Sequence, residues 1–176
     1  MVAYPKLTKH DAAWIDSFRA EYDKKHHPLI DPHFTLIFPT DKNISPESLR
    51  KHVEDNATSS FEAVCRCAQV VDNPFIKKWH IFLVPDEGYS LIVKLRDRLY
   101  TGELEDELRL DIQFIPHIGI ATLDTARECN ALADGLNSNY LGSYRLAVRT
   151  WIDHLDICSE VEDKIVSTAR VNLLKE

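Results

Sequence analysis

Short apolar runs alternate with amphipathic stretches along the chain, and this alternation predicts a mixed α/β fold. Several runs are rich in β-branched and aromatic residues, as strands are. These runs occupy residues 2–7, 31–39, 61–71, 79–85, 113–121 and 144–158. The tail at 164–174 is expected to return as one further strand. We therefore assign the chain to the α/β class, of the α+β kind.

Four stretches combine helical spacing with helix-start signals. Ser45-Pro46 is the clearest start, because a serine side chain caps free amides of the first turn and proline lacks the N–H that would go unpaired there. The helices are expected from Thr8 or Asp11 to about His26, from Ser45 to about Asp55, from about 86 to 100, and from Asp124 through about 136. The order β-α-β-α-β therefore occurs twice.

The middle strand of each copy begins with the dipeptide Pro-His, at Pro32-His33 and at Pro116-His117. His33 precedes the following strand by 28 residues, and His117 precedes its counterpart by 27. Nearly equal intervals around the same dipeptide indicate a duplicated unit. The duplication predicts a bilobal fold, in which two β-α-β-α-β pseudo-repeats face each other around a central cleft.

The repeat also sets the expected domain organisation. No stretch rich in Pro, Gly or Ser separates the halves, so we expect one domain over residues 1–176. Its pseudo-repeat lobes are expected at about 1–75 and 76–176, with exchange of strands between the lobes allowed.

Charge and composition narrow the class of protein. The chain has 21 Lys and Arg against 28 Asp and Glu, a formal net charge of −7, and a broad nucleic-acid surface would instead need clustered cations. No run approaches the ~18 apolar residues of a membrane span, and residues 1–11 lack the features of a signal peptide. We therefore expect a cytoplasmic monomer with no membrane partner.

The four cysteines fit a reducing compartment, where thiols stay unpaired. Cys65 and Cys67 are two residues apart, which is not the C-x-x-C spacing of a zinc or redox site, and on a regular strand they would share one face. With Cys129 and Cys158, they are expected to be core thiols. No metal and no cofactor is predicted.

Residues 31–39, DPHFTLIFP, place two polar side chains within an apolar run. On a strand, His33 and Thr35 project to the same side, about 6.6 Å apart. If a pseudo-twofold axis relates the lobes, His117 faces His33 across the cleft. Two imidazoles on opposite sides of one phosphorus atom can perform in-line chemistry: one takes a proton from water, and the other gives a proton to the departing ribose oxygen.

These residues resemble the 2H phosphoesterase superfamily, which includes the 2′-5′ RNA ligase and cyclic nucleotide phosphodiesterase branches. Its signature is two H-x-[T/S]-x tetrads on facing strands of a bilobal fold, and residues 33–36, HFTL, match the first tetrad. The phrases PHFTLIFP, FLVPDEG and RDRLYTGEL are similar to its bacterial, RNA ligase-like branch. The resemblance implies that His33 and His117 are catalytic and that Thr35 donates a hydrogen bond to the phosphate.

The second tetrad departs from the family pattern. Gly119 stands where the family has a second phosphate-binding hydroxyl. Thr122 is not expected to replace it, since five residues after His117 it should point to the opposite face, roughly 16 Å along the strand. A hydrogen bond to a charged group contributes about 1.5 to 3 kcal/mol, so activity is expected to be reduced.

The function predicted is that of a metal-independent phosphodiesterase. Its substrate would be a 2′,3′-cyclic phosphate or a 2′-5′ linked end of a nucleotide or RNA, with two-histidine general acid/base catalysis. One alternative, motivated by Gly119, is a weakened 2H module that binds nucleotides or RNA termini without efficient turnover. Another is a structural α/β interaction domain in which the histidines are accidental.

Further substrate contacts are expected from side chains outside the two tetrads. Tyr4 and Trp151 are candidates for stacking on a base, as aromatic platforms do in nucleic-acid-binding proteins. Arg149, together with Arg145 on the same predicted strand face, is a candidate for a phosphate contact. His80 lies in a predicted strand and is expected to be structural.

Overall fold

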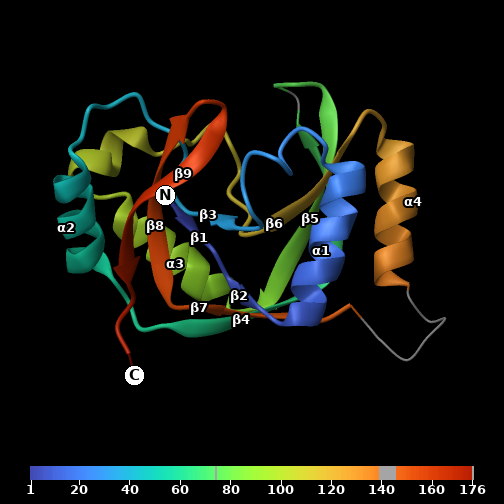
Figure 1. Cartoon of the computed structure of the whole chain (residues 1–176), viewed down its shortest axis with the longest axis horizontal. Coiled ribbons are helices and arrows are strands. Elements are labelled where there is room, and N and C mark those ends of the chain that lie inside the picture. Colours follow the sequence, from blue (N-terminus) through green and yellow to red (C-terminus); the bar gives the residue numbers. More distant parts are fainter. Residues whose placement is uncertain (74, 139–145, 176) are drawn as a thin grey trace.

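A single curled sheet dominates the computed structural model, which describes residues 1–73, 75–138 and 146–175. Within these residues, nine antiparallel strands pair in the order β2-β7-β4-β5-β6-β3-β1-β8-β9 (Figure 1). The strands are β1 (Val2–Ala3), β2 (Lys6–Leu7), β3 (Phe34–Thr35), β4 (Phe61–Asn73), β5 (Lys78–Glu87), β6 (Ile118–Leu123), β7 (Val148–Ile152), β8 (His154–Val161) and β9 (Lys164–Asn172). The predicted mixed α/β class is confirmed, and the returning strand at the tail is present as β9.

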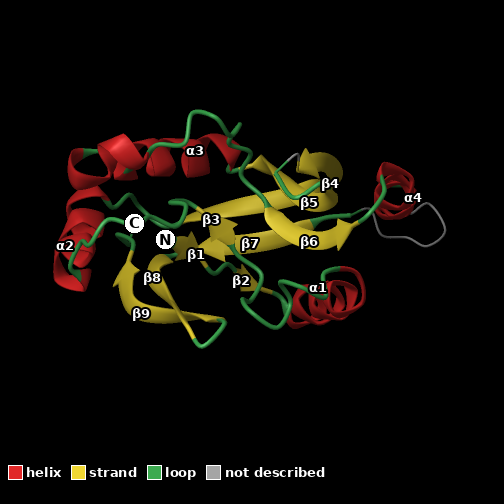
Figure 2. Ribbon diagram, turned by 90° about the horizontal axis from the view of Figure 1, so that it is seen from above, coloured by secondary structure: helices red, strands yellow, loops and turns green. Residues whose placement is uncertain are grey.

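Helices flank the sheet at two ends. They are α1 (Lys9–Tyr22), α2 (Pro46–Asn56), α3 (Tyr89–Leu99) and α4 (Ala126–Asn137), with a 3₁₀ helix, η1 (Gly102–Glu107). Figure 2 shows α2 and α3 toward one end of the sheet and α1 and α4 toward the other. No helix in the described part of the chain is long and apolar enough to cross a membrane.

The helix starts follow the capping rules closely. Ser45 caps α2 as predicted, and of the two residues predicted for α1, Thr8 and Asp11, Thr8 is the cap; both hydroxyls accept backbone N–H groups of the first turn. The predicted cap at Asp124 is wrong, because Thr125 accepts the amide of Glu128 instead. The predicted end of the first helix near His26 is also wrong, and α1 ends at Tyr22.

Two long predicted strands are each broken in two, and both breaks lie at one seam. The segment 2–7 splits at residues 4 and 5, and β1 then pairs with β3 and β8 while β2 pairs with β7. The segment 144–158 splits at Asp153 into β7 and β8, and its residues 144 and 145 lie outside the described part. Lys6 and Asp153 form an ion pair across the seam.

This seam closes the sheet on itself. Two residues span at most about 7 Å, so β1 and β2 must lie close together although six positions separate them in the pairing order. Figure 1 shows β1 leading directly into β2 through the middle of the fold. The strands from β2 to β1 therefore curl into a nearly closed ring, as the right-handed twist of antiparallel sheets permits.

The halves of the chain interleave within this ring. β4, from the first half, pairs with β5, and β8, from the second half, pairs with β1. The two middle strands, β3 and β6, pair with each other at the centre of the sheet. All of these strands belong to one continuous sheet. The two pseudo-repeat lobes around a central cleft, with strand exchange allowed between them, stay a prediction.

Most of the predicted 31–39 strand is irregular. Only β3 forms ladder pairs, because the amides of Leu36 and Ile37 both donate to the carbonyl of Met1. Phe34, Leu36 and Ile37 are buried in the core, whereas His33 and Thr35 keep partial exposure. The alternation expected for this motif is therefore present around β3 without a long strand.

A β-bulge corrects one expectation about the cysteines. The register of β4 against β5 shifts between Cys65 and Cys67, and a bulge reverses the face on which later residues point. Cys65 is buried and Cys67 is exposed, so the two do not share a face and Cys67 is not a core thiol.

Gly88, at the start of α3, is required by a close approach. Its φ is +79°, and an added Cβ would lie 2.6 Å from the carbonyl oxygen of Glu62. A left-handed conformation and this lack of space both favour glycine. The tight turn lets α3 fold back beside the sheet immediately after β5.

Candidate active site

The two Pro-His dipeptides meet at the centre of the sheet. β3 and β6 are antiparallel with Phe34 opposite Ile118, so His33 comes beside Gly119 and Thr35 beside His117. Directly opposed residues have Cβ atoms about 4.5 to 5.5 Å apart and diagonal neighbours about 7 to 8 Å apart. The two imidazoles are therefore diagonal neighbours on adjacent strands, and the register brings the tetrads together.

Each histidine is held by the same local bond. Nδ1 of His33 lies 2.8 Å from the carbonyl oxygen of Asp31, and Nδ1 of His117 lies 2.5 Å from that of Ile115. A carbonyl can only accept, so each Nδ1 carries the proton and each Nε2 is an unprotonated acceptor. A proline lies between each histidine and the residue whose carbonyl accepts its Nδ1 proton, and its fixed φ restricts the backbone, which favours the same turn twice.

Burial keeps both imidazoles neutral. It lowers the pKa of His33 to about 4, against a smaller raising effect of the Asp31 carbonyl. Burial likewise lowers the pKa of His117 to about 4, and the neighbouring imidazoles of His33 and His80 lower it further. An anion bound between the rings would favour their charged forms and raise both pKa values.

The two tetrads differ at the position two residues after the histidine, where the first has the Thr35 hydroxyl and the second has Gly119. Thr35 Oγ1 lies 3.1 Å from Nε2 of His33 and donates its proton there. At Gly119, an added Cβ would meet no described heavy atom within 4 Å. The position that the family fills with a second hydroxyl is therefore open space beside the imidazoles.

His117 is packed in an aromatic stack that the sequence did not reveal. Its ring lies 3.5 Å from the Phe82 ring with an interplanar angle of 15°, and Phe82 lies 5.5 Å from His80 at the same angle. Phe82 is the cross-strand partner of Gly119. His33 has a looser neighbour, since the Tyr4 ring stands edge-on at 6.1 Å.

A cavity of about 480 Å³ opens beside this stack. Its walls come from β3, the ends of β4 and β5 and the loop before β6: Thr35, Phe38, Val71, Asp72, Asn73, Phe75, His80, Phe82, Asp111, Ile112, Gln113, Phe114, Ile115 and His117. Among the lining residues that the structure describes, none is lysine or arginine. The walls are mainly apolar and aromatic, which suits a flat, uncharged ligand group.

A hydrogen-bonded chain supports the far end of the stack. Asn73 donates to Nε2 of His80 at 3.1 Å, His80 Nδ1 donates to Thr122 at 3.0 Å, and Thr122 donates to Asp23 at 2.8 Å. Asp23 is buried, which opposes its ionisation, but bonds from His26 and Thr122 outweigh this effect and lower its pKa. His80 is thus held by its neighbours and also lines the cavity.

The expected orientation of Thr122 is wrong. A bulge between Ile81 and Phe82 shifts the β5–β6 register, so Thr122 faces His80 while Gly119 faces Phe82. Thr122 consequently lies on the same face as Gly119. Its hydroxyl is occupied by His80 and Asp23, and for this reason it does not supply the missing donor.

Two buried arginines brace the loops that lead into the dipeptides. Arg19 of α1 donates through Nη2 to the carbonyl of Ile30 at 2.8 Å, just before the first dipeptide. Arg96 of α3 lies over the Phe114 ring, 4.3 Å from its centroid, just before the second. Nothing in the local sequence singled out either arginine, because their loops are distant along the chain.

The other predicted contacts are placed as follows. Tyr4 lies beside His33, and burial raises its pKa. Arg149 is exposed on β7 and pairs with Glu62 at 3.2 Å, and Trp151 is exposed on the same strand. Neither lines the cavity that contains His117. Arg145 falls outside the described residues.

Comparison with known proteins bears on both tetrads. The family model described as the 2'-5' RNA ligase superfamily matches residues 7–164, which include both Pro-His dipeptides. A search of curated proteins finds no match. The match spans most of the chain, from β2 to the start of β9.

Proposed function

Because the chain belongs to the 2'-5' RNA ligase superfamily, which is the 2H phosphoesterase superfamily, we propose that it is a metal-independent phosphodiesterase. Membership supports phosphoesterase or ligase activity in general. The proposed substrates are 2′,3′-cyclic phosphates or 2′-5′ linked ends of nucleotides and RNA. The observation that carries the proposal is the diagonal pair of imidazoles, each with Nδ1 bonded to a carbonyl, with Nε2 of His33 accepting a hydrogen bond from the Thr35 hydroxyl.

The reaction needs one proton removed and one delivered. Water attacks the phosphorus atom while the neutral imidazole of one histidine accepts its proton at Nε2, and the imidazolium of the other donates its Nε2 proton to the departing ribose oxygen. The P–O bond to that oxygen breaks as the bond to water forms. Thr35 turns its hydroxyl from His33 to a phosphate oxygen. If a ribose hydroxyl of a second strand takes the place of water, the same pair forms a 2′-5′ linkage.

A bound phosphodiester is needed for one of the two imidazoles to be protonated near neutral pH. With pKa values of about 4, both imidazoles are neutral in the free protein at pH 7, and a general acid must be protonated. The negative charge of the phosphodiester raises the pKa of the adjacent imidazoles. Binding of the substrate therefore favours protonation of one histidine, which then acts as the general acid.

Hydrolysis of a 2′,3′-cyclic mononucleotide tests the proposal. His33→Ala and His117→Ala are each expected to lower kcat by about 10²- to 10⁴-fold, the usual contribution of a general acid or base. His27→Ala is the matched control, since His27 pairs only with Asp16 at the surface among the described residues. Activity should persist in EDTA. Turnover that survives both active-site substitutions, or that EDTA abolishes, would contradict this mechanism.

One observation favours a second candidate function. Gly119 removes a phosphate donor, and the space it leaves is unfilled by described atoms. The chain would then be a 2H module that holds nucleotides or RNA termini with little turnover. Tight binding of a 2′,3′-cyclic nucleotide by calorimetry, weakened by His33→Ala but unaccompanied by hydrolysis, would select this function over the enzyme.

A further inference from the structure

We infer that the β4–β5 hairpin and the end of α1 form a binding track for an RNA strand, so that the preferred substrate is the end of an oligonucleotide and not a mononucleotide. The inference rests on the proposed function for the position of the reacting phosphate. The track is defined here by Lys24, Lys25, Phe75, Lys77 and Lys78. It begins at the cavity that His117 lines and continues over the neighbouring surface.

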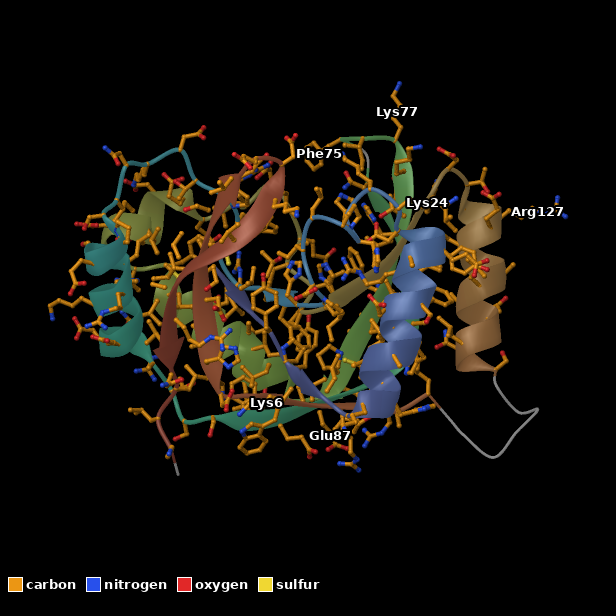
Figure 3. The ribbon with its side chains drawn as sticks, in the orientation of Figure 1. Lys6, Lys24, Phe75, Lys77, Glu87 and Arg127 are labelled. Carbon is orange, nitrogen blue, oxygen red and sulfur yellow. The ribbon has the colours of Figure 1, made fainter. Side chains whose placement is uncertain are left out.

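Four lysines gather at this end of a protein that is acidic overall. Lys24 and Lys25 follow α1, and Lys77 and Lys78 lie at the turn between β4 and β5. A second cavity, of about 540 Å³, is lined by Lys24, Lys25 and Lys78 together with one carboxylate, that of Glu21. Figure 3 shows Lys24 and Lys77 at the same end of the molecule, with Lys77 projecting outward.

Most of these cations are available to a ligand. Within residues 1–73, 75–138 and 146–175, the ion pairs do not include Lys24, Lys25 or Lys77, whereas Lys78 pairs with Asp124. With a net charge of −7, a local cationic cluster is an exception that attracts a polyanion to one place.

One hydrogen bond joins the linings of the two cavities. His80 lines the first cavity and Thr122 the second, and His80 Nδ1 donates to the Thr122 hydroxyl at 3.0 Å. Along β5, Phe82 and Lys78 are four residues apart, or about 13 Å. That length corresponds to about four nucleotides of a stacked strand at about 3.4 Å each.

An exposed aromatic ring stands in the β4–β5 turn, two residues before Lys77. Phe75 is 66% exposed and lines the first cavity, and Ile76 is 41% exposed and lines the second. Cations next to exposed aromatics are the combination that binds single-stranded nucleic acid, through phosphate contacts and base stacking. Because Phe75 faces the cavity of His117, the ligand favoured is an RNA strand whose end enters that cavity, and not a membrane surface.

The test compares two substrates of the full chain. One is a 2′,3′-cyclic mononucleotide, and the other is a ten-nucleotide RNA that ends in a 2′,3′-cyclic phosphate. Lys24→Glu/Lys25→Glu should lower kcat/KM for the RNA by about tenfold, since it replaces two charges that attract phosphate by two that repel it, and leave the mononucleotide value unchanged. Arg50→Glu/Lys51→Glu on α2, at the other end of the molecule (Figure 1), makes the same charge change and should alter neither value.

The dependence of kcat/KM on salt concentration and on RNA length gives two further tests of the track. The salt dependence of kcat/KM for RNA should lose about 0.7 in log–log slope per phosphate contact removed. In the wild type, kcat/KM should rise with RNA length up to about five nucleotides and then level off. Equal loss on both substrates, equal loss in the α2 control, or no dependence on length would overturn the track.

Binding separates this inference from the proposed function. Fluorescence anisotropy with a labelled ten-nucleotide RNA bearing a 3′-hydroxyl needs no turnover. Lys24→Glu/Lys25→Glu and Phe75→Ala should each weaken binding about fivefold or more, whereas Leu91→Ala, an exposed apolar control on α3, should not. RNA binding without hydrolysis of either substrate would sink the phosphodiesterase and keep the track. Binding to phosphatidylserine vesicles in preference to RNA would overturn the track itself.

Discussion

The two Pro-His turns of this protein share their proton-transfer geometry but differ in everything that surrounds it. Both histidines bond through Nδ1 to the carbonyl two residues earlier, and burial lowers the pKa of each to about 4. The first has the Thr35 hydroxyl and an edge-on tyrosine, and the second has open space at Gly119 and a stacked Phe82. The comparison teaches that the two imidazoles are held in the same way, while the described tetrad residues place a hydroxyl only on the β3 side; under the proposed function, that side would bind the anion.

Removal of the only tetrad hydroxyl gives the largest expected effect on this asymmetry. Thr35→Val keeps the shape of the side chain and deletes the donor, so kcat/KM for a 2′,3′-cyclic nucleotide should fall about 10- to 150-fold, the equivalent of ~1.5 to 3 kcal/mol. Thr35→Ser retains a hydroxyl and should stay within a few-fold of wild type. Steady-state kinetics of both variants measure this. Equal activity of the valine and serine variants would show that Thr35 does not bind the anion.

Adding a hydroxyl at position 119 makes the second Pro-His turn resemble the first. Gly119→Thr should raise kcat/KM up to about tenfold, which is less than the loss at Thr35 because the new hydroxyl has no partners to orient it. The open space around an added Cβ accommodates the side chain. Gly119→Ala adds the Cβ without the hydroxyl and is the control. A folded threonine variant with no gain would mean that the site is built around the glycine.

The aromatic neighbours offer a matched pair of smaller effects. Phe82→Leu removes the ring stacked on His117, and kcat should fall about three- to tenfold, in keeping with ~0.5 to 1.5 kcal/mol for an aromatic pair. Tyr4→Leu at His33 should cost less, since its ring is edge-on at 6.1 Å. The His117 imidazole signals in NMR spectra should broaden only in the Phe82 variant. A larger fall in kcat for Tyr4→Leu than for Phe82→Leu would contradict the view that His117 is the more tightly packed histidine.

The pH behaviour tests what remains symmetric. In the free protein both imidazoles should titrate near pH 4 by NMR, as burial disfavours the charged form. Inorganic phosphate favours that form, so it should raise both pKa values toward neutrality. The requirement for one imidazolium then makes kcat/KM fall as pH rises above about 4, and kcat fall at a higher pH. A phosphate shift confined to one histidine would place the anion away from the space between them.

Local signals in the sequence explain which predictions held. Ser45-Pro46 and Thr8 form their caps because capping depends on a few neighbouring residues. The splits at residues 4–5 and at Asp153 were missed, since the closure of the sheet brings together strands that are distant along the chain. The facing of Cys67 and Thr122 was missed because bulges depend on the partner strand.

The sequence by itself determined which side chains this protein brings to its centre: two Pro-His turns, one followed by a threonine and one by a glycine. Only the tertiary structure decided that Phe34 pairs with Ile118, which makes the imidazoles diagonal neighbours. It also decided that Phe82 packs against His117 and that two arginines brace the loops. The physical reason is that turns and caps depend on adjacent residues, whereas register and ring stacking depend on cross-strand contacts that local sequence does not encode.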